Sequence, residues 1–169
     1  DGVLNRAIPV DGRPHAPSTA AGVEMLPGVA EACRALQEAG FVLVVVTNQP
    51  EVSRGGIDPA ELEAMNRRVA DRSGVDHVRV CPHDDADECG CRKPAPGLLV
   101  DAAAELHLAL SRSWMVGDRW RDVAAGQAAG VRCVFIDHGW REQRPEGEYL
   151  VAGDLAGAAP LILGAPGAT

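Results

Sequence analysis

Short apolar runs alternate with longer amphipathic segments along most of this chain. The run Phe41–Thr47 is rich in β-branched residues, which predicts a strand buried on both faces, as in a parallel sheet covered by helices. Weaker runs of the same kind predict three more strands, at His77–Cys81, Ser113–Gly117 and Val131–Asp137. Helical patterns separate these runs. The alternation indicates an α/β fold with a mostly parallel sheet.

The predicted helices have recognisable ends. A first helical pattern starts at Pro27-Gly28 and ends at Gly40, where glycine permits a left-handed turn. A second begins at the N-cap Asp58 and runs to about Arg72, with Glu61 placed to complete a capping box. Two further patterns predict helices at Pro96–Leu106 and Arg121–Ala129.

Two of the predicted connections are long. The segment Asn5–Gly28 is rich in proline and glycine, which predicts an irregular loop that faces a substrate. The other long connection follows the strand His77–Cys81. With 169 residues, of which 46% are hydrophobic, the chain fits a single domain, residues 1–169, and leaves no room for a large second domain.

Net charge narrows the classes of partner. The formal charge is -8 and no basic run occurs, which argues against binding to nucleic acid or to an anionic membrane. No stretch approaches the roughly 18 consecutive apolar residues of a membrane-spanning helix. We therefore expect a soluble cytoplasmic monomer, and a small anionic substrate remains compatible with the composition.

The second long connection carries three of the five cysteines. Together with one histidine they form the Cys3His set of a tetrahedral structural zinc site: Cys81, His83, Cys89 and Cys91. Idle thiols are the simpler alternative, but Cys89 and Cys91 are too close in sequence for an easy disulfide, and two ligand pairs on one loop favour Zn2+. Cys33 and Cys133 lie on a helical pattern and an apolar run, which is typical of small buried side chains.

Polar residues follow the predicted strands at the point where each one ends. In open α/β sheets, ligands bind outside the carboxyl ends of the strands. The side chains expected there are a hydroxyl, two amides, two cations and two carboxylates: Thr47, Asn48, Gln49, Arg92, Lys93, Asp118 and Asp122. Taken singly, each of these residues favours a structural role. Their recurrence at successive strand ends favours phosphoryl transfer, which needs donors, a cation and carboxylates that hold Mg2+.

Four sequence motifs resemble those of the haloacid dehalogenase (HAD) superfamily, in its zinc-containing branch of heptose-bisphosphate and histidinol-phosphate phosphatases. Asp1–Asn5 is similar to the later part of the first motif, and Val45–Gln49 to the second. Cys91–Pro94 is similar to the third, and Met115–Arg119, followed by Asp122, to the fourth. The motifs occur in the family's order along the chain, which makes coincidence improbable. The resemblance implies a three-layer Rossmann-like fold with a zinc-stabilised loop and no large cap domain.

The resemblance also implies roles for the catalytic residues. Asp1 corresponds to the general acid and base, whose backbone carbonyl binds the metal. Thr47 would hydrogen-bond the transferring phosphoryl group, while Arg92 and Lys93 would neutralise its charge.

The remaining site residues serve the substrate and the two metals. Asn48 and Gln49 would contribute to substrate binding together with the two cations. Asp118 would bind Mg2+, and Asp122 would bind it or support its shell. Zn2+ would hold the loop through the four residues named above. Trp140 lies on a polar segment and is a candidate to stack on a sugar.

One departure from the family concerns the nucleophile. The family's nucleophilic aspartate stands two places before the position of Asp1, and the sequence does not include it. The apolar strand that precedes that motif, at the centre of the family's sheet, is missing too. We therefore expect two neighbouring strands without hydrogen-bond partners, exposed apolar surface, and no turnover by the chain as it stands.

These features lead to three functional hypotheses. The first is Mg2+-dependent hydrolysis of a small phosphorylated sugar or metabolite through an aspartyl-phosphate, with a heptose bisphosphate 7-phosphatase ranked first and histidinol phosphate second as substrate. Another is a non-catalytic, zinc-stabilised domain that binds phosphate-bearing ligands. A nucleic-acid end phosphatase uses similar motifs, but the acidic composition lacks the basic track that a polynucleotide requires.

Overall fold

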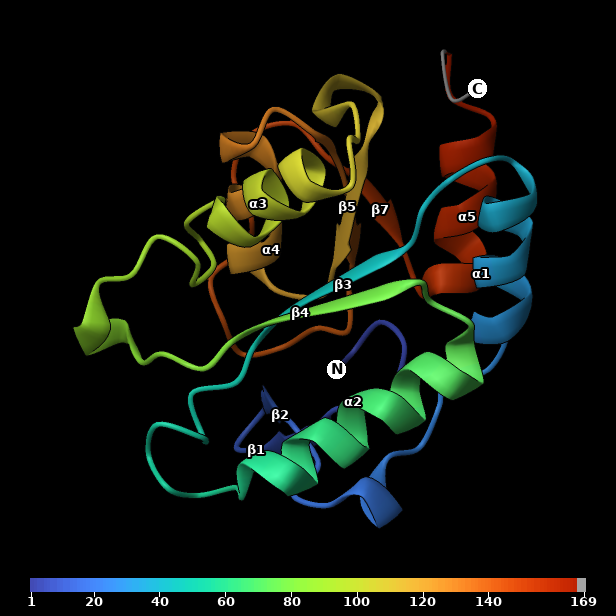
Figure 1. Ribbon diagram of the computed structural model, residues 1–169. Helices are drawn as coiled ribbons and strands as arrows, with labels where there is room; N and C mark the ends of the chain where they lie inside the picture. The colour runs from blue at the N-terminus through green and yellow to red at the C-terminus, as the bar shows by residue number, and fades with distance from the viewer. Residues whose placement is uncertain (167–169) are drawn as a thin grey trace.

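The structure is a computed structural model that describes residues 1–166 (Figure 1). The last three residues of the predicted domain, 167–169, lie outside the described residues. Two groups of parallel strands form the centre of the molecule. One group is β3 (Val44–Asn48) and β4 (His77–Cys81), and the other is β5 (Trp114–Gly117), β6 (Arg132–Ile136) and β7 (Leu150–Ala152). The predicted α/β fold with parallel strands is confirmed.

Helices cover both faces of these strands (Figure 1). On one face, α1 packs against α5, and both bury apolar side chains against Val134 and Ile136 of β6. On the other face, α4 packs against β5 and β6, while α3 packs against β3 and β4. The five helices of residues 1–166 are α1 (Val29–Glu38), α2 (Pro59–Ser73), α3 (Gly97–Glu105), α4 (Trp120–Ala128) and α5 (Leu155–Leu163). This three-layer arrangement is the predicted one. None of the helices in the described part of the chain has the length and apolar character needed to cross a membrane.

Local sequence signals account for several of the observed boundaries. Strand β4 has the predicted ends, whereas β3 starts at Val44 and not at Phe41. Just before β3, the backbone N–H of Leu43 donates to the Asp76 carboxylate, 2.8 Å away, and not to a backbone oxygen of β4.

The start of α2 is only partly as predicted. The Asp58 carboxylate accepts a hydrogen bond from the Ala60 N–H at 2.7 Å, as an N-cap does. The predicted capping box is wrong, because the Glu61 carboxylate accepts its hydrogen bond from the backbone N–H of Ala20. Glu61, which was expected to cap its own helix, thus connects α2 to the long segment Asn5–Gly28.

That connection, predicted as an irregular loop, contains a hairpin and a short 3-10 helix. The prediction is corrected: β1 (Ile8–Val10) pairs antiparallel with β2 (Arg13–His15), and a 3-10 helix, η1, spans Ala20–Gly22. Asp11 and Gly12 have φ angles of 50° and 76°, the left-handed conformation that two-residue hairpin turns require. An Asp-Gly pair is a known signal for such a turn, so the sequence did contain the cue.

The sequence patterns also missed the end of the fold, β7 and α5. The Asp154 carboxylate caps α5 by accepting from the Gly157 N–H at 2.7 Å. Leu155 and Ile162 are buried in the core on α5, but Pro160 within the helix obscures its helical pattern. This helix matters because it completes the layer that covers β6.

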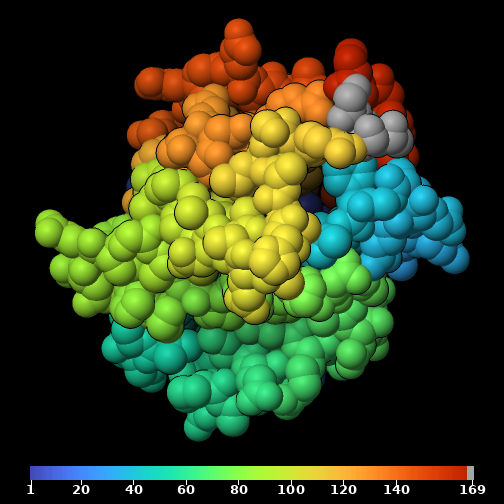
Figure 2. Space-filling view, turned by 45° about the horizontal axis from the view of Figure 1, so that its top comes forward, coloured from blue at the N-terminus to red at the C-terminus, as the bar shows by residue number. Residues whose placement is uncertain are grey.

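Strands β3 and β5 do not pair with each other, so within residues 1–166 each has one edge without a strand partner. A cavity of about 1050 Å3 runs between these edges and is lined by apolar side chains of both strands, among them Val46 and Val116. Figure 2 shows a hollow between the cyan and yellow segments. The residues that line the cavity include Phe41 and Leu110. Every residue of β3 is only half-buried for the same reason, although its composition predicts burial on both faces. The two open edges agree with the expected loss of two strand pairings.

Candidate active site and cysteine-histidine cluster

Lys93 lies at the centre of the candidate site and is the only lysine in the sequence. It is 8% exposed. Its Nζ donates to the backbone oxygen of Val46 at 2.6 Å and pairs with Asp122 Oδ1 at 2.7 Å. An ammonium group carries three N–H donors, and these two contacts use two of them. The third donor remains for an anion, held at a fixed place by the other two.

Asn48, predicted to bind substrate, braces Lys93. Its side-chain amide donates to the backbone oxygen of Lys93 at 3.0 Å and accepts from the backbone N–H of Lys93 at 3.1 Å. This pair of hydrogen bonds fixes the lysine beside the carboxyl end of β3. The amide of Asn48 is thereby used within the protein.

Thr47 and Gln49 stand on either side of Asn48. The Gln49 amide nitrogen donates to the Thr47 hydroxyl oxygen at 3.2 Å, so the hydroxyl keeps its own hydrogen for another acceptor. Gln49 is 5% exposed, and its Oε1 is a buried oxygen without a hydrogen-bond partner. Thr47 follows Val46, whose backbone oxygen holds Lys93, and its hydroxyl is a donor of the kind that a phosphoryl oxygen requires.

Two buried carboxylates follow β5. Asp122, on the first turn of α4, pairs with Lys93 and also accepts from the backbone N–H of Arg119 at 3.0 Å. Asp118 makes no ion pair within residues 1–166. Burial raises its pKa, and the negative charge of Asp122 raises it further. A buried carboxylate without a cationic partner is the donor that a divalent cation such as Mg2+ would neutralise.

The first residues of the chain lie against Asp118. Gly2 adopts the left-handed conformation, with φ of 74°, and a β-carbon added there would collide with the Asp118 carboxylate. The backbone nitrogen of Asp1 is buried near Asp118, Lys93 and Asp122. The side chain of Asp1 is held by Asn5, whose amide nitrogen donates to its Oδ1 at 2.7 Å.

Asn5 is 3% exposed and had no predicted role beyond its place in the first motif. The position of Asn5 at the end of the first motif was the feature of the sequence that could have indicated its contact with Asp1.

Arg92 points toward the cysteine loop. Its Nε donates to Asp85 Oδ1 at 2.9 Å and its Nη1 donates to the backbone oxygen of His83 at 3.0 Å. Arg121 of α4 donates to the same Asp85 oxygen at 2.9 Å. The guanidinium of Arg92 therefore connects residues within the loop between β4 and α3, and Arg92 also lines the cavity.

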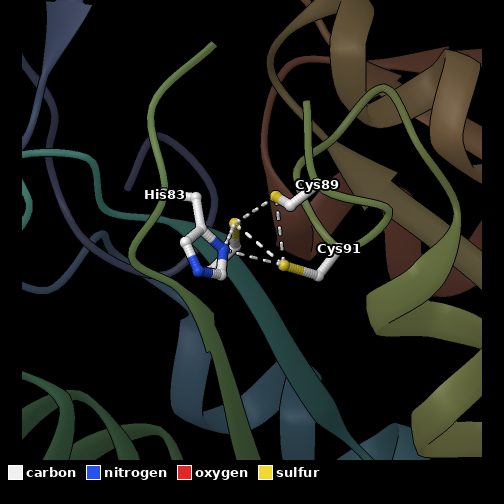
Figure 3. A group of neighbouring side chains, drawn as sticks. His83, Cys89 and Cys91 are labelled. Carbon is white, nitrogen blue, oxygen red and sulfur yellow. Dashed lines mark hydrogen bonds between the residues drawn. The ribbon is translucent and has the colours of Figure 1, made fainter. Parts of the chain in front are cut away.

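The cysteine and histidine candidates form one cluster (Figure 3). The Cys81 and Cys91 sulfurs are 3.2 Å apart, those of Cys89 and Cys91 are 3.4 Å apart, and those of Cys81 and Cys89 are 3.7 Å apart. His83 Nδ1 lies 3.3 Å from the Cys91 sulfur. Four ligands around Zn2+ at about 2.3 Å per bond place sulfurs about 3.8 Å apart, so the cluster needs only slight expansion to hold the ion.

The close packing of the cysteines changes the pKa values of their thiols. Burial opposes ionisation at Cys89, but hydrogen bonds from its neighbours, Cys91 above all, bring its pKa down to about 7. Burial and then hydrogen bonding with Cys81 raise the pKa of Cys91 to about 12. Three thiols at this spacing cannot all ionise without a cation, and Zn2+ binds cysteine as the thiolate.

The predicted site residues of the phosphoryl pocket thus meet at one cavity. Its lining includes the residues named for acid-base, phosphate and metal roles: Asp1, Thr47, Asn48, Gln49, Arg92, Lys93, Asp118 and Asp122. The cysteine-histidine cluster lies at the start of the segment that delivers Lys93. Such a pocket combines a fixed cation, a hydroxyl donor and an unpaired carboxylate, which is the equipment for handling a phosphate ester and its counterion.

Comparison with known proteins agrees with this chemistry. A family model described as haloacid dehalogenase-like hydrolase matches residues 10–130. The chain is 37% identical over 147 residues to a D-glycero-beta-D-manno-heptose-1,7-bisphosphate 7-phosphatase of Pseudomonas putida, covering 82% of this chain and 84% of that protein. The protein of the same name from Escherichia coli K12 is 37% identical over 137 residues, 74% of this chain and 72% of the other.

Solved structures of heptose bisphosphate phosphatases are also similar to this chain. The D,D-heptose 1,7-bisphosphate phosphatase of B. bronchiseptica, in complex with magnesium and phosphate, superimposes with a TM-score of 0.79 at 31% identity, over 96% of this chain and 94% of that one. Its counterpart from Burkholderia thailandensis gives 0.66 at 26% identity, over 98% and 95% of the two chains.

The chain therefore belongs to the haloacid dehalogenase-like hydrolase family. Within that family it is a phosphoric monoester hydrolase, the class of its relatives. The predicted superfamily and enzyme class are confirmed.

Proposed function

We propose that this protein is a 7-phosphatase for D-glycero-D-manno-heptose 1,7-bisphosphate. The observation that carries the proposal is the identity of 37% to relatives with this activity in their names, over most of both chains. The pocket around Lys93 supplies the chemistry that the activity needs. A phosphorylated sugar is accordingly the proposed substrate.

In the proposed mechanism, Lys93 and Thr47 bind the non-bridging oxygens of the phosphoryl group. The third N–H of Lys93 and the hydroxyl of Thr47 are the donors, and both are pre-oriented by contacts within the protein. Asp1 donates a proton to the leaving oxygen and later accepts one from water, with its carboxylate oriented by Asn5. The attacking carboxylate belongs two residues ahead of Asp1, beyond the first residue of the sequence.

Both proposed metals have matching donors. Asp118 would hold Mg2+ together with the backbone oxygen of Asp1, and the ion would supply positive charge against the phosphoryl oxygens. Cys81, His83, Cys89 and Cys91 would hold Zn2+, which would fix the loop that leads to Lys93. Arg92 supports that loop through Asp85 and the backbone of His83 and adds positive charge to the cavity.

A phosphate-release screen tests the function. Two forms are compared: the chain itself, and the chain preceded by an apolar strand that ends in Asp and one further residue, to provide the nucleophile and to fill the open edges of β3 and β5. We expect Mg2+-dependent release from the heptose bisphosphate by the extended form and none by the chain itself, because the aspartyl-phosphate needs that carboxylate.

The same screen includes a control variant and tests the two alternative functions. An extended form with Asn in place of the added Asp should be inactive. Preference for histidinol phosphate over the heptose bisphosphate would overturn the proposed substrate. Phosphate binding without turnover in the extended form would instead favour the non-catalytic binding domain.

A further inference from the structure

The segment that follows β6, residues 138–142, reaches back over the candidate site, and we call it the Trp140 loop. The indole Nε1 of Trp140 donates to Asp118 Oδ2 at 2.8 Å. His138 Nε2 lies 2.7 Å from the backbone oxygen of Gly2 and donates to it. The rings of His138 and Trp140 lie side by side, with centroids 5.2 Å apart. One short loop thus touches both the carboxylate after β5 and the backbone at the start of the chain.

Contacts at its far end hold the Trp140 loop in place. The Glu142 carboxylate forms a bidentate ion pair with the Arg119 guanidinium, in which the Nε–Oε2 distance is 2.9 Å. Arg141 donates its backbone N–H to the oxygen of Gly12 in the hairpin turn at 2.8 Å. Because Arg119 directly follows Asp118, the Glu142 pair anchors the loop next to the carboxylate that Trp140 contacts.

These contacts restrict the orientation of the Asp118 carboxylate. A carboxylate has two oxygens, and a metal ligand works best when only one orientation is available to it. The indole occupies Oδ2, and Gly2 packs against the same group so closely that any side chain there would collide with it. Oδ1 is left as the oxygen for a cation.

We propose that Trp140 is a positioning residue, which fixes the Asp118 carboxylate by its indole N–H so that Oδ1 faces the divalent cation. The inference rests on the proposed function, in which Asp118 holds Mg2+. It assigns Trp140 a role different from the sugar stacking that its polar surroundings indicated. The indole binds to the carboxylate, and its N–H is not available to a substrate.

The test replaces Trp140 by Phe, which removes the N–H donor and retains an aromatic ring. Binding of Mn2+, used as a paramagnetic substitute for Mg2+, is measured on the full chain by electron paramagnetic resonance. We expect the affinity to fall about tenfold or more, the usual range when a partner of a metal ligand is removed. Trp120→Phe is the matched control, since Trp120 lies under Arg121 on α4 and makes no hydrogen bond to Asp118. It should bind Mn2+ as the unmodified chain does.

Two further measurements distinguish a wrong role for Trp140 from a wrong cation site at Asp118. The metal-free Trp140→Phe and Trp120→Phe chains should have melting temperatures within a few degrees of the unmodified chain, since neither loses a buried ion pair. Asp118→Asn should lose Mn2+ binding. If Asp118→Asn loses binding and Trp140→Phe does not, Trp140 has no positioning role. If Asp118→Asn binds Mn2+ normally, the proposed cation site itself is wrong, and the inference fails with it.

Discussion

Replacing Lys93 by methionine is expected to remove phosphate binding almost completely. Lys93 is the only lysine in the sequence, and its buried ammonium keeps one N–H free while Val46 and Asp122 occupy the other two. In the extended chain, turnover should fall about 1000-fold or more, because a fixed donor at the developing charge contributes at least about 100-fold and this donor also carries a charge. Inorganic phosphate binding by calorimetry measures the effect without the nucleophile.

The Lys93 substitution leaves Asp122 buried without its partner, which costs about 3–5 kcal/mol of stability. The double variant Lys93→Met with Asp122→Asn separates the two effects, because the amide removes the uncompensated charge. We expect it to recover most of the melting temperature and none of the phosphate binding. Arg34→Met is the control for a lost positive charge, since Arg34 is exposed on α1. Normal phosphate binding by the double variant would contradict the pocket assignment.

The second large effect is expected at the cysteine-histidine cluster. We expect the protein to copurify with about one equivalent of Zn2+ and to lose it in Cys89→Ser, with a marked fall in melting temperature. Structural zinc sites contribute strongly to folding, about 10 kcal/mol or more in zinc-finger peptides. The loop between β4 and α3 would lose the ion that holds Cys81, His83 and Cys91 together. Elemental analysis and thermal melting measure the two results.

Cys33→Ser is the matched control for the zinc prediction. Cys33 is 2% exposed in the core of α1 and lies outside the cluster, so this change should cost only the effect of a buried hydroxyl and leave the zinc content unchanged. An equal loss of stability in the two variants, or an absence of zinc in the unmodified protein, would remove the zinc-loop proposal.

Sequence patterns predicted the strands and helices around the candidate site better than they predicted the β1–β2 hairpin and helix α5. Strand β4 and the ends of α1, α2 and α4 follow from apolar periodicity and from glycine or aspartate caps, which act within a few residues. The hairpin β1–β2 was missed because the surrounding prolines and glycines outweighed the Asp11-Gly12 turn. Helix α5 was missed because Pro160 lies inside it.

The sequence by itself determined the kinds of group in the pocket and their order along the chain, because polar residues directly after apolar runs must lie at the ends of strands. It could not determine which groups pair. The contact between Lys93 and Asp122 joins the segment before α3 to the first turn of α4, and the contact of Trp140 with Asp118 depends on a loop that returns after β6. Only the tertiary structure decided these partners, because hydrogen bonds act over about 3 Å between residues far apart in sequence.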